Sequence, residues 1–259
     1  MGTQKRAAAT RNKLIEAAID LWAEKGYQET TPKEVTKAAG LTPGAFYYHF
    51  KSKEELSAAI AERSRPAMTE VWKAYLGTPQ PGLENIVRAA FAVADMIAGD
   101  RMHWVVFHLD NAIGYLGPQE RMVHRQQVAD LTALMAGALA DSEIRADITR
   151  REAGELMWIA FNGAQLMSDL LEEDGPAAVE RLALACNCAL RGIVPDEQFS
   201  RMERFVQEIA ARYTGHRDTA PDDPQRPDPA VATRAPLSAV PTDSQMTPTH
   251  WQGAVLAPR

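Results

Sequence analysis

The stretch from Thr30 to Leu56 places helix start and stop signals so close together that it fits only short helices joined by a tight turn. Thr31, Pro32 and Glu34 predict an N-cap, a first helical residue and the return carboxylate of a capping box. Gly40 predicts the end of that helix, because glycine readily adopts the left-handed backbone angles found just beyond a helix C-terminus. The stretch therefore begins with a short helix and a turn.

A second short helix is expected directly after this turn. Thr42 and Pro43 repeat the cap-and-proline signal, and Phe46 and Phe50 are spaced to face inward. Ser52 begins another predicted capping box and a longer helix. Two short helices around a tight turn form a helix-turn-helix, the arrangement in which the second helix enters the major groove of DNA.

The second short helix leaves small, polar and aromatic side chains facing outward or sideways. The residues expected to contact DNA there are Thr42, Pro43, Gly44, Ala45, Tyr47, Tyr48 and His49. The alternative is an ordinary three-helix packing unit that does not bind nucleic acid. Such a unit seldom exposes neighbouring aromatic side chains, so we expect these to meet a partner.

Charge is distributed unevenly along the chain. Residues 1–65 carry 11 Lys and Arg against 8 Asp and Glu, which gives +3, whereas the remainder carries 17 against 26, which gives −9. Basic side chains near the motif can contact phosphates, and such contacts position a protein on DNA without reading its sequence. The candidates are Lys5, Arg6, Arg11, Lys13, Lys33, Lys37, Lys51 and Lys53.

The segment AAGLTPGAFYYHFKSKEEL resembles the DNA-binding signature of the TetR family of bacterial repressors. The resemblance covers roughly residues 10–60, including a preceding helix that Gly26 ends. It places Lys33 and Lys53 beside the DNA backbone on either side of the recognition helix. It also implies a homodimer that binds double-stranded operator DNA.

The remainder of the chain up to residue 214 repeats apolar residues at helical spacing and shows no strand-like alternation of useful length. A short helical stripe is expected after Pro66. Longer helices are predicted at residues 83–98, 102–113, 120–139, 150–171, 177–191 and 195–213. We predict an all-α fold with a three-helix helix-turn-helix domain at residues 1–52 and a helical ligand-binding and dimerisation domain at residues 53–214.

Residues 215–259 hold eight of the chain's 16 prolines and few aliphatic clusters, so we expect a disordered tail in which Trp251 is unassigned. Cys186 and Cys188 lie two apart on a predicted helix, where their side chains diverge, and we expect both to stay reduced. The chain shows no membrane-spanning run and no signal peptide, which predicts a cytoplasmic protein that does not enter a membrane.

Three further stretches resemble the γ-butyrolactone receptor branch of the TetR family: LENIVRAAFAVADMI, SEIRADIT and CALRGIVPDEQFSRM. The branch implies a small-molecule inducer that is γ-butyrolactone-like or antibiotic-like. It commonly carries a tryptophan in the helix that corresponds to residues 120–139. This sequence has Gln126 and Gln127 near that place, which favours a larger and more polar ligand, as in relatives described as pseudo-receptors.

Ligand sites are apolar concavities with a few convergent polar groups. Apolar walls are expected from Trp72, Phe91, Trp104, Phe107, Met122, Trp158 and Phe161. Polar contacts are expected from His108, Gln127, Asn162 and Gln165. For each of these side chains the alternative is ordinary core packing or a helix-helix contact.

An enzyme is the main alternative from another functional class. The sequence lacks a nucleophile with a histidine and an acid, a zinc-binding helix, a phosphate loop and paired carboxylates. His103, His108 and Asp110 are close in sequence but diverge on a helix. We therefore expect no catalysis, metal or cofactor. A DNA-binding dimer without a small-molecule ligand stays open as a second alternative.

Overall fold

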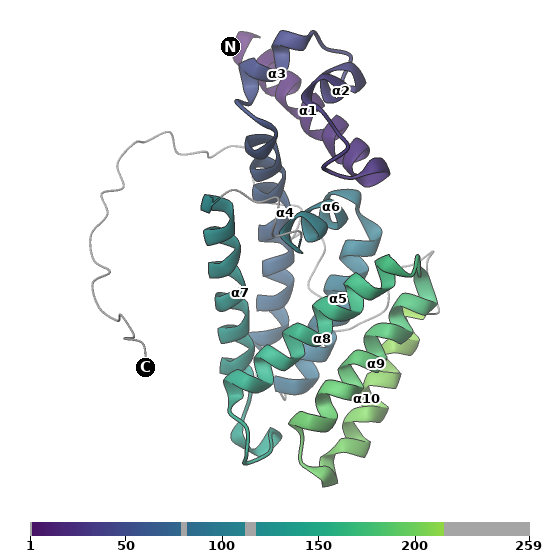
Figure 1. The fold of residues 1–259 in the computed structure, drawn as a ribbon. Coiled ribbons are helices and arrows are strands. Elements are labelled where there is room, and N and C mark those ends of the chain that lie inside the picture. Colours follow the sequence, from purple (N-terminus) through teal and green to yellow (C-terminus); the bar gives the residue numbers. More distant parts are fainter. Residues whose placement is uncertain (1, 79–81, 112–117, 215–259) are drawn as a thin grey trace, which may run out of the picture.

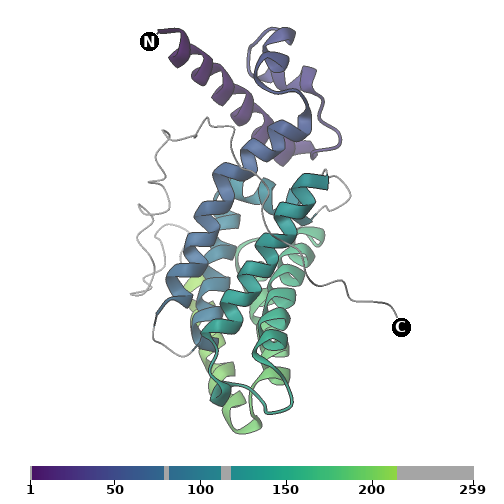
Figure 2. The same ribbon diagram turned by 90° about the vertical axis from the view of Figure 1, so that its left-hand side faces the viewer.

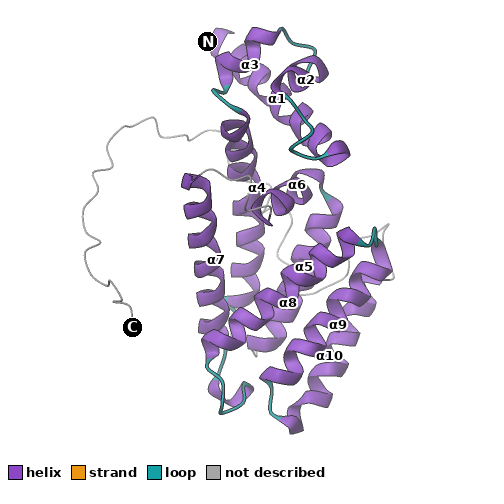
Figure 3. Cartoon of the chain, in the orientation of Figure 1, coloured by secondary structure: helices purple, strands orange, loops and turns teal. Residues whose placement is uncertain are grey.

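The computed structural model describes residues 2–78, 82–111 and 118–214, and these ranges contain helices and loops but no strand (Figure 3). The helices are α1 (Gly2–Lys25), α2 (Pro32–Ala38), α3 (Pro43–His49), α4 (Lys53–Leu76), α5 (Gly82–Gly99), α6 (Arg101–Asn111), α7 (Pro118–Ala138), α8 (Arg150–Leu170), α9 (Gly175–Ile193) and α10 (Asp196–Thr214), with a 3₁₀ turn η2 (Asp141–Glu143). The all-α prediction is confirmed. The predicted tail and Trp251 lie outside the described residues.

The signals that define α2 act as the sequence predicts. The Glu34 backbone N–H donates to Thr31 Oγ1 at 3.3 Å, and the Thr31 N–H donates to Glu34 Oε2 at 2.8 Å, which completes the capping box. After the helix, Gly40 has a φ of +66°, in the left-handed region. The Leu41 N–H donates back to Thr36 O at 2.9 Å. These bonds satisfy backbone groups at both ends of α2 and fix the turn.

The two caps that follow are less complete than predicted. Thr42 is the N-cap of α3 and Pro43 its first residue, but the Thr42 hydroxyl makes no capping hydrogen bond. Ser52 Oγ accepts from the Glu55 N–H at 3.2 Å, whereas Glu55 Oε2 accepts from the Lys51 N–H at 2.6 Å. The second half of this capping box therefore closes one residue earlier than expected.

The predicted break at Pro66 is wrong, because α4 continues through this residue to Leu76. Proline removes one helical hydrogen bond and crowds the carbonyl one turn earlier. Pro66 and Glu62 both lie on the exposed side of α4, so water can solvate that carbonyl. Trp72 and Tyr75, farther along, are buried and hold the second half of the helix against the core. Packing on both sides of the proline keeps α4 continuous.

Figures 1 and 2 show that α1–α3 form one end of the molecule and that α4 runs from this end into the bundle of α5–α10. Two apolar cores match this division, and α4 contributes to both: Leu56 and Ile60 to the first, Trp72 and Tyr75 to the second. The predicted domain boundary after residue 52 assigns all of α4 to the second domain, although the first turns of α4 pack with α1–α3. That division stays a prediction.

Helix α6 also belongs to both cores. Val105, Val106 and Leu109 pack in the core of α1–α4, whereas Phe107 packs in the core of the bundle. An α-helix turns by about 100° per residue, so side chains along α6 face different directions and can reach both cores. A movement of α6 would therefore change the packing of both cores.

Candidate DNA-binding face and ligand cavity

Helix α3 lies at the end of the molecule formed by α1–α3 (Figure 1), and two of its aromatic side chains face solvent. Tyr47 is 66% exposed and Tyr48 is 79% exposed, while Phe46, on the inward face of α3, is 1% exposed. Phe50, which follows the helix, is also buried. The inward and outward faces of α3 are thus divided as the sequence predicts.

The remaining α3 residues expected to contact DNA lie on or beside the same face. Thr42, Pro43 and Gly44 are exposed, whereas Ala45 and His49 are half-buried. The His49 ring contacts the edge of the Tyr48 ring, with centroids 4.9 Å apart. Burial lowers the pKa of His49, and the positive charge of Arg11 lowers it further. His49 is therefore mainly neutral at pH 7 in the free protein.

The two lysines assigned to the DNA backbone differ in their surroundings. Lys33 is exposed on α2. Lys53 Nζ instead donates to Tyr27 O at 2.9 Å and Thr30 O at 3.1 Å, and it lies 4.1 Å from the centre of the Tyr27 ring. Burial lowers the pKa of Lys53. Lys53 thus joins α4 to the loop before α2, and because an ammonium has three donors, one N–H is not used by these two bonds.

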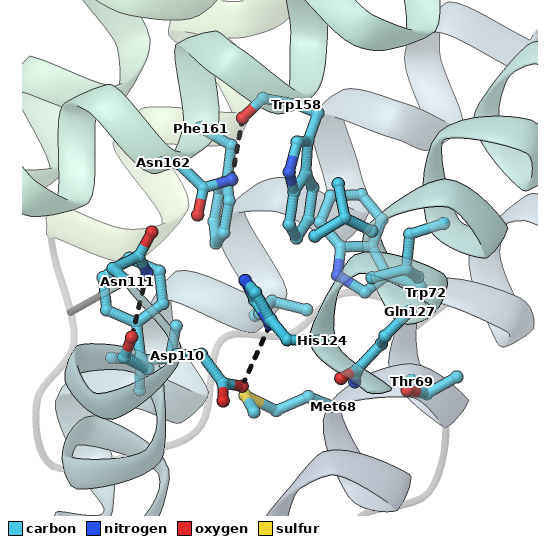
Figure 4. A pocket seen from close by; sticks show the side chains of 15 residues that line it. Met68, Thr69, Trp72, Asp110, Asn111, His124, Gln127, Trp158, Phe161 and Asn162 are labelled. Carbon is cyan, nitrogen blue, oxygen red and sulfur yellow. Dashed lines mark hydrogen bonds and ion pairs between the residues drawn. The ribbon is translucent and has the colours of Figure 1, made fainter. Parts of the chain in front are cut away.

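A cavity of about 50 Å³ lies in the bundle between α4, α5, α6, α7 and α8 (Figure 4). Aromatic rings form much of its wall, with the ring centres of Trp72 and Phe161 5.7 Å apart and those of Trp158 and Phe161 5.8 Å apart. Its lining residues are Met68, Thr69, Trp72, Val93, Ile97, Phe107, Asp110, Asn111, His124, Gln127, Val128, Leu131, Trp158, Phe161 and Asn162.

Six of the side chains expected to contact a ligand line this cavity: Trp72, Phe107, Gln127, Trp158, Phe161 and Asn162. Phe91, Trp104, His108, Met122 and Gln165 do not line this cavity, and their contact with a ligand stays a prediction. Phe91 is buried on α5 against the ring of Tyr213, while Met122 is 65% exposed on α7. Helical spacing identified these helices correctly but not which face of each would line a cavity.

Trp104 and His108 form a separate contact between α6 and α8. Their rings lie 3.8 Å apart, the Trp104 Nε1–H donates to Asp169 Oδ1 at 3.3 Å, and His108 Nε2 lies 2.7 Å from Asp169 Oδ2. Gln165, three residues after Asn162 on α8, is half-buried and is not among the residues that line the cavity. Trp104 and His108 therefore join α6 to α8, and neither they nor Gln165 form the cavity wall.

The polar end of the cavity was not predicted from the sequence. Asp110 is buried and pairs with Arg65 of α4 through both carboxylate oxygens, one of them 3.0 Å from Arg65 Nε. His124 Nδ1 of α7 lies 3.8 Å from Asp110 Oδ2. A charged residue within an apolar helix was the available signal, but it was considered only as a candidate for catalysis. Arg65 and Asp110 connect the cavity to the helix shared with α1–α3.

A larger open groove, of about 590 Å³, lies between α7 and α8. Val128 and Trp158 line both this groove and the cavity. The two spaces are therefore separated in part by these side chains.

The outer face of α8 and α9 exposes several large apolar side chains. Leu156, Ile159, Leu166 and Leu170 of α8 are 39%, 64%, 40% and 75% exposed, and Leu184 of α9 is 60% exposed. The four α8 residues are three, seven and four positions apart, which places them on one stripe. Exposed apolar stripes of this kind mark surfaces that pack against a partner.

Leu182 of α9, two positions before Leu184, does not belong to this exposed face. Leu182 is 1% exposed and packs in the core of the bundle. Two positions on a helix are about 200° apart, so Leu182 faces inward when Leu184 faces outward. The cysteines of α9 divide in the same way: Cys186 is buried and Cys188 is exposed.

Known proteins resemble this chain in both sequence and fold. Residues 14–60 match the family described as bacterial regulatory proteins, tetR family. The transcriptional repressor BepR of Brucella suis is 29% identical over 170 residues, which cover 64% of this chain and 78% of BepR. A crystal structure of a γ-butyrolactone receptor, described as ArpA-like, has a TM-score of 0.63 and 26% identity over 80% of this chain and 98% of the receptor.

A further similar structure is CprB of Streptomyces coelicolor in complex with its operator sequence. It has a TM-score of 0.60 and 27% identity, and the match covers 80% of this chain and 98% of CprB. The chain belongs to the TetR family of transcriptional regulators. It is therefore a DNA-binding regulator, and the family is not one of enzymes.

The matched family segment runs from the middle of α1 to the first turns of α4 in this TetR-family chain. The three residues considered for catalysis have separate partners: His103 Nδ1 lies 2.7 Å from Ser64 Oγ, His108 contacts Asp169, and Asp110 pairs with Arg65. Among the described residues, no group of His, Cys, Asp and Glu could hold a metal ion, and no helix is long and apolar enough to cross a membrane.

Proposed function

We propose that this chain acts as a homodimeric repressor that binds a two-part operator through α3 and releases it when a small molecule enters the bundle cavity. Each α3 would lie in a major groove with Tyr47 and Tyr48 toward the bases or sugars and Lys33 toward the backbone. The residues at 1–52, with the start of α4, would form the DNA-binding domain. Residues 53–214 would bind the ligand and the second protomer.

The dimer is supported by the apolar stripe on α8 and α9. Ile159, Leu170 and Leu184 are each more than half exposed in the single chain. Burying such side chains against a second copy is favourable, and a twofold arrangement places the same stripe of each protomer in contact. Two recognition helices can then reach successive major grooves, roughly 34–36 Å apart.

The observation that carries ligand control is the position of α6 between the cavity and the DNA-binding end. Phe107 and Asp110 line the cavity, while Val106 and Leu109 pack in the core of α1–α4. The Arg65–Asp110 pair joins the same helix to α4. A ligand that favours another position of α6 would therefore favour another position of α1–α3, which is the requirement for coupling two sites.

The size of the cavity limits how a ligand could bind. Ligand sites typically measure about 300–1,000 Å³, well above the 50 Å³ found between these helices. An inducer would therefore displace part of the wall, and Trp158 borders the neighbouring groove. A compact γ-butyrolactone-like or antibiotic-like ring compound suits the aromatic walls. Gln127 adds polarity within the cavity, while Gln126 is exposed on the other side of α7.

The proposal is tested by screening ring compounds for those that raise the melting temperature and release a fluorescent operator fragment. With such a compound, Asp110→Asn should keep ligand binding but weaken release, because the charge that holds Arg65 to α6 is lost. Arg63→Ala is the matched control, since Arg63 forms a more exposed pair with Glu16, 3.1 Å apart, between α4 and α1. If compounds bind without any release, a DNA-binding dimer without ligand control is the better description.

A further inference from the structure

The hydrogen-bonding atoms of the cavity wall are oriented by the helices that carry them. The Asn162 Nδ2–H donates to Trp158 O at 2.9 Å, and the Asn111 Nδ2–H donates to Phe107 O at 2.9 Å. Because a backbone carbonyl only accepts hydrogen bonds, the amide nitrogen must face the helix in both residues. The Oδ1 atom of each asparagine is left as an acceptor. In Figure 4, Asn162 Oδ1 points away from Trp158 O, toward the side that holds Asp110.

Two further polar atoms of the wall are buried without a hydrogen-bond partner among the described residues. They are Gln127 Oε1 and His124 Nδ1. His124 Nδ1 is 3.8 Å from Asp110 Oδ2, too far for a hydrogen bond. Burial lowers the pKa of His124 despite the opposing charge of Asp110, so the ring is mainly neutral at pH 7 and has one acceptor nitrogen. A buried acceptor without a donor is costly, and a bound ligand could supply the donor.

The charge of the cavity favours a neutral ligand. Asp110 is the lining residue that carries a charge at pH 7, and Arg65 already pairs with both of its oxygens. A cationic ligand would therefore compete with Arg65. An anionic ligand would face the carboxylate and the acceptor atom of Asn162, which disfavours it in a site of low dielectric constant.

We propose that the cavity selects neutral ring compounds that donate a hydrogen bond, through a hydroxyl or an N–H group, to Asn162 Oδ1 or Gln127 Oε1. The rings of Trp72, Phe107, Trp158 and Phe161 would enclose the apolar body of the ligand. This inference rests on the proposed function, because it assumes that the cavity takes a ligand. It adds that donor groups, and not the acceptors of a simple lactone ring, decide selectivity.

Phenol, fluorobenzene and benzoate test the inference, because they share a ring but differ in donor and charge. Their binding to the full chain is measured by tryptophan emission and by ligand-observed NMR. Fluorobenzene is the more apolar of the two neutral compounds, so apolar burial alone would favour it. We expect phenol to bind at least about fivefold more tightly than fluorobenzene, and benzoate to bind most weakly.

The double variant Asn162→Leu, Gln127→Leu, of similar size but without either acceptor, should remove the preference for phenol. Gln165→Leu on the same helix is the matched control and should keep it, since Gln165 does not line the cavity. Equal or tighter binding of fluorobenzene, or a phenol preference that survives the double variant, would overturn the inference while leaving ligand control intact. Phenol that binds as expected but never releases operator would support the inference and count against the proposed function. Binding by none of the three compounds would overturn both.

Discussion

Removing the exposed aromatic side chains of α3 should separate DNA binding from stability. Tyr48 is 79% exposed, so Tyr48→Ala should change the free energy of unfolding by no more than about 0.5 kcal/mol. The same change should remove a contact with a base or sugar worth about 1–3 kcal/mol per half-site, or roughly 5- to 150-fold in affinity. Tyr47→Ala should behave similarly, because Tyr47 is 66% exposed.

Phe46→Ala provides the contrast, because Phe46 is 1% exposed and packs beneath α3. Its truncation should cost about 3–5 kcal/mol of stability by leaving a cavity in the core. The assays are anisotropy titration of a labelled operator at fixed salt and thermal unfolding followed by circular dichroism. Unchanged operator affinity in both tyrosine variants, with unchanged melting temperatures, would falsify the assignment of α3 as the helix that contacts DNA.

Three further variants test the charges and the dimer. Lys33→Met should lower the slope of log affinity against log salt by about 2 for the dimer, about 1 for each half-site, without changing the melting temperature, whereas Lys53→Met should also lower the melting temperature, because two backbone carbonyls lose their donor. Equal melting temperatures of the Lys33→Met and Lys53→Met variants would contradict this difference. Operator affinity should rise as pH falls from about 8 to about 6, because burial lowers the pKa of His49 in the free protein and a nearby phosphate in the complex would raise that pKa. His49→Gln should abolish this pH dependence. A pH dependence that persists in His49→Gln would assign it to another group. Leu184→Glu should yield monomers by light scattering and faster thiol labelling of Cys188, and an intact dimer would count against the α8–α9 interface.

Much of the fold could be predicted because its signals are local. Caps, prolines and glycines act within a few residues, so the ends of α2 were set by Thr31 and Gly40 as expected. The error at Pro66 has the opposite origin. Local preference favours a break there, but the buried side chains Trp72 and Tyr75 outweigh it. Such packing depends on residues distant in sequence and cannot be read from the proline itself.

The cavity was harder to predict because it depends on which faces of five helices meet. Periodicity identified Trp158 and Phe161 but could not separate them from Phe91, which packs on α10. The Arg65–Asp110 pair joins residues 45 positions apart, and no local pattern links them. The faces of α9 follow the same rule, since half a helical turn separates Leu182, which is buried, from Leu184, which is exposed.

The central claim is that two copies of this chain place their α3 helices in one operator, and hydroxyl-radical footprinting of the DNA upstream of its own gene tests it most directly. We expect protection in two related half-sites whose centres are about 10 base pairs, or a multiple of that distance, apart. Protection should disappear in the Tyr47→Ala, Tyr48→Ala double variant and in Leu184→Glu. A single protected half-site that survives in the Leu184→Glu monomer, or protection that is unchanged without both tyrosines, would contradict the account.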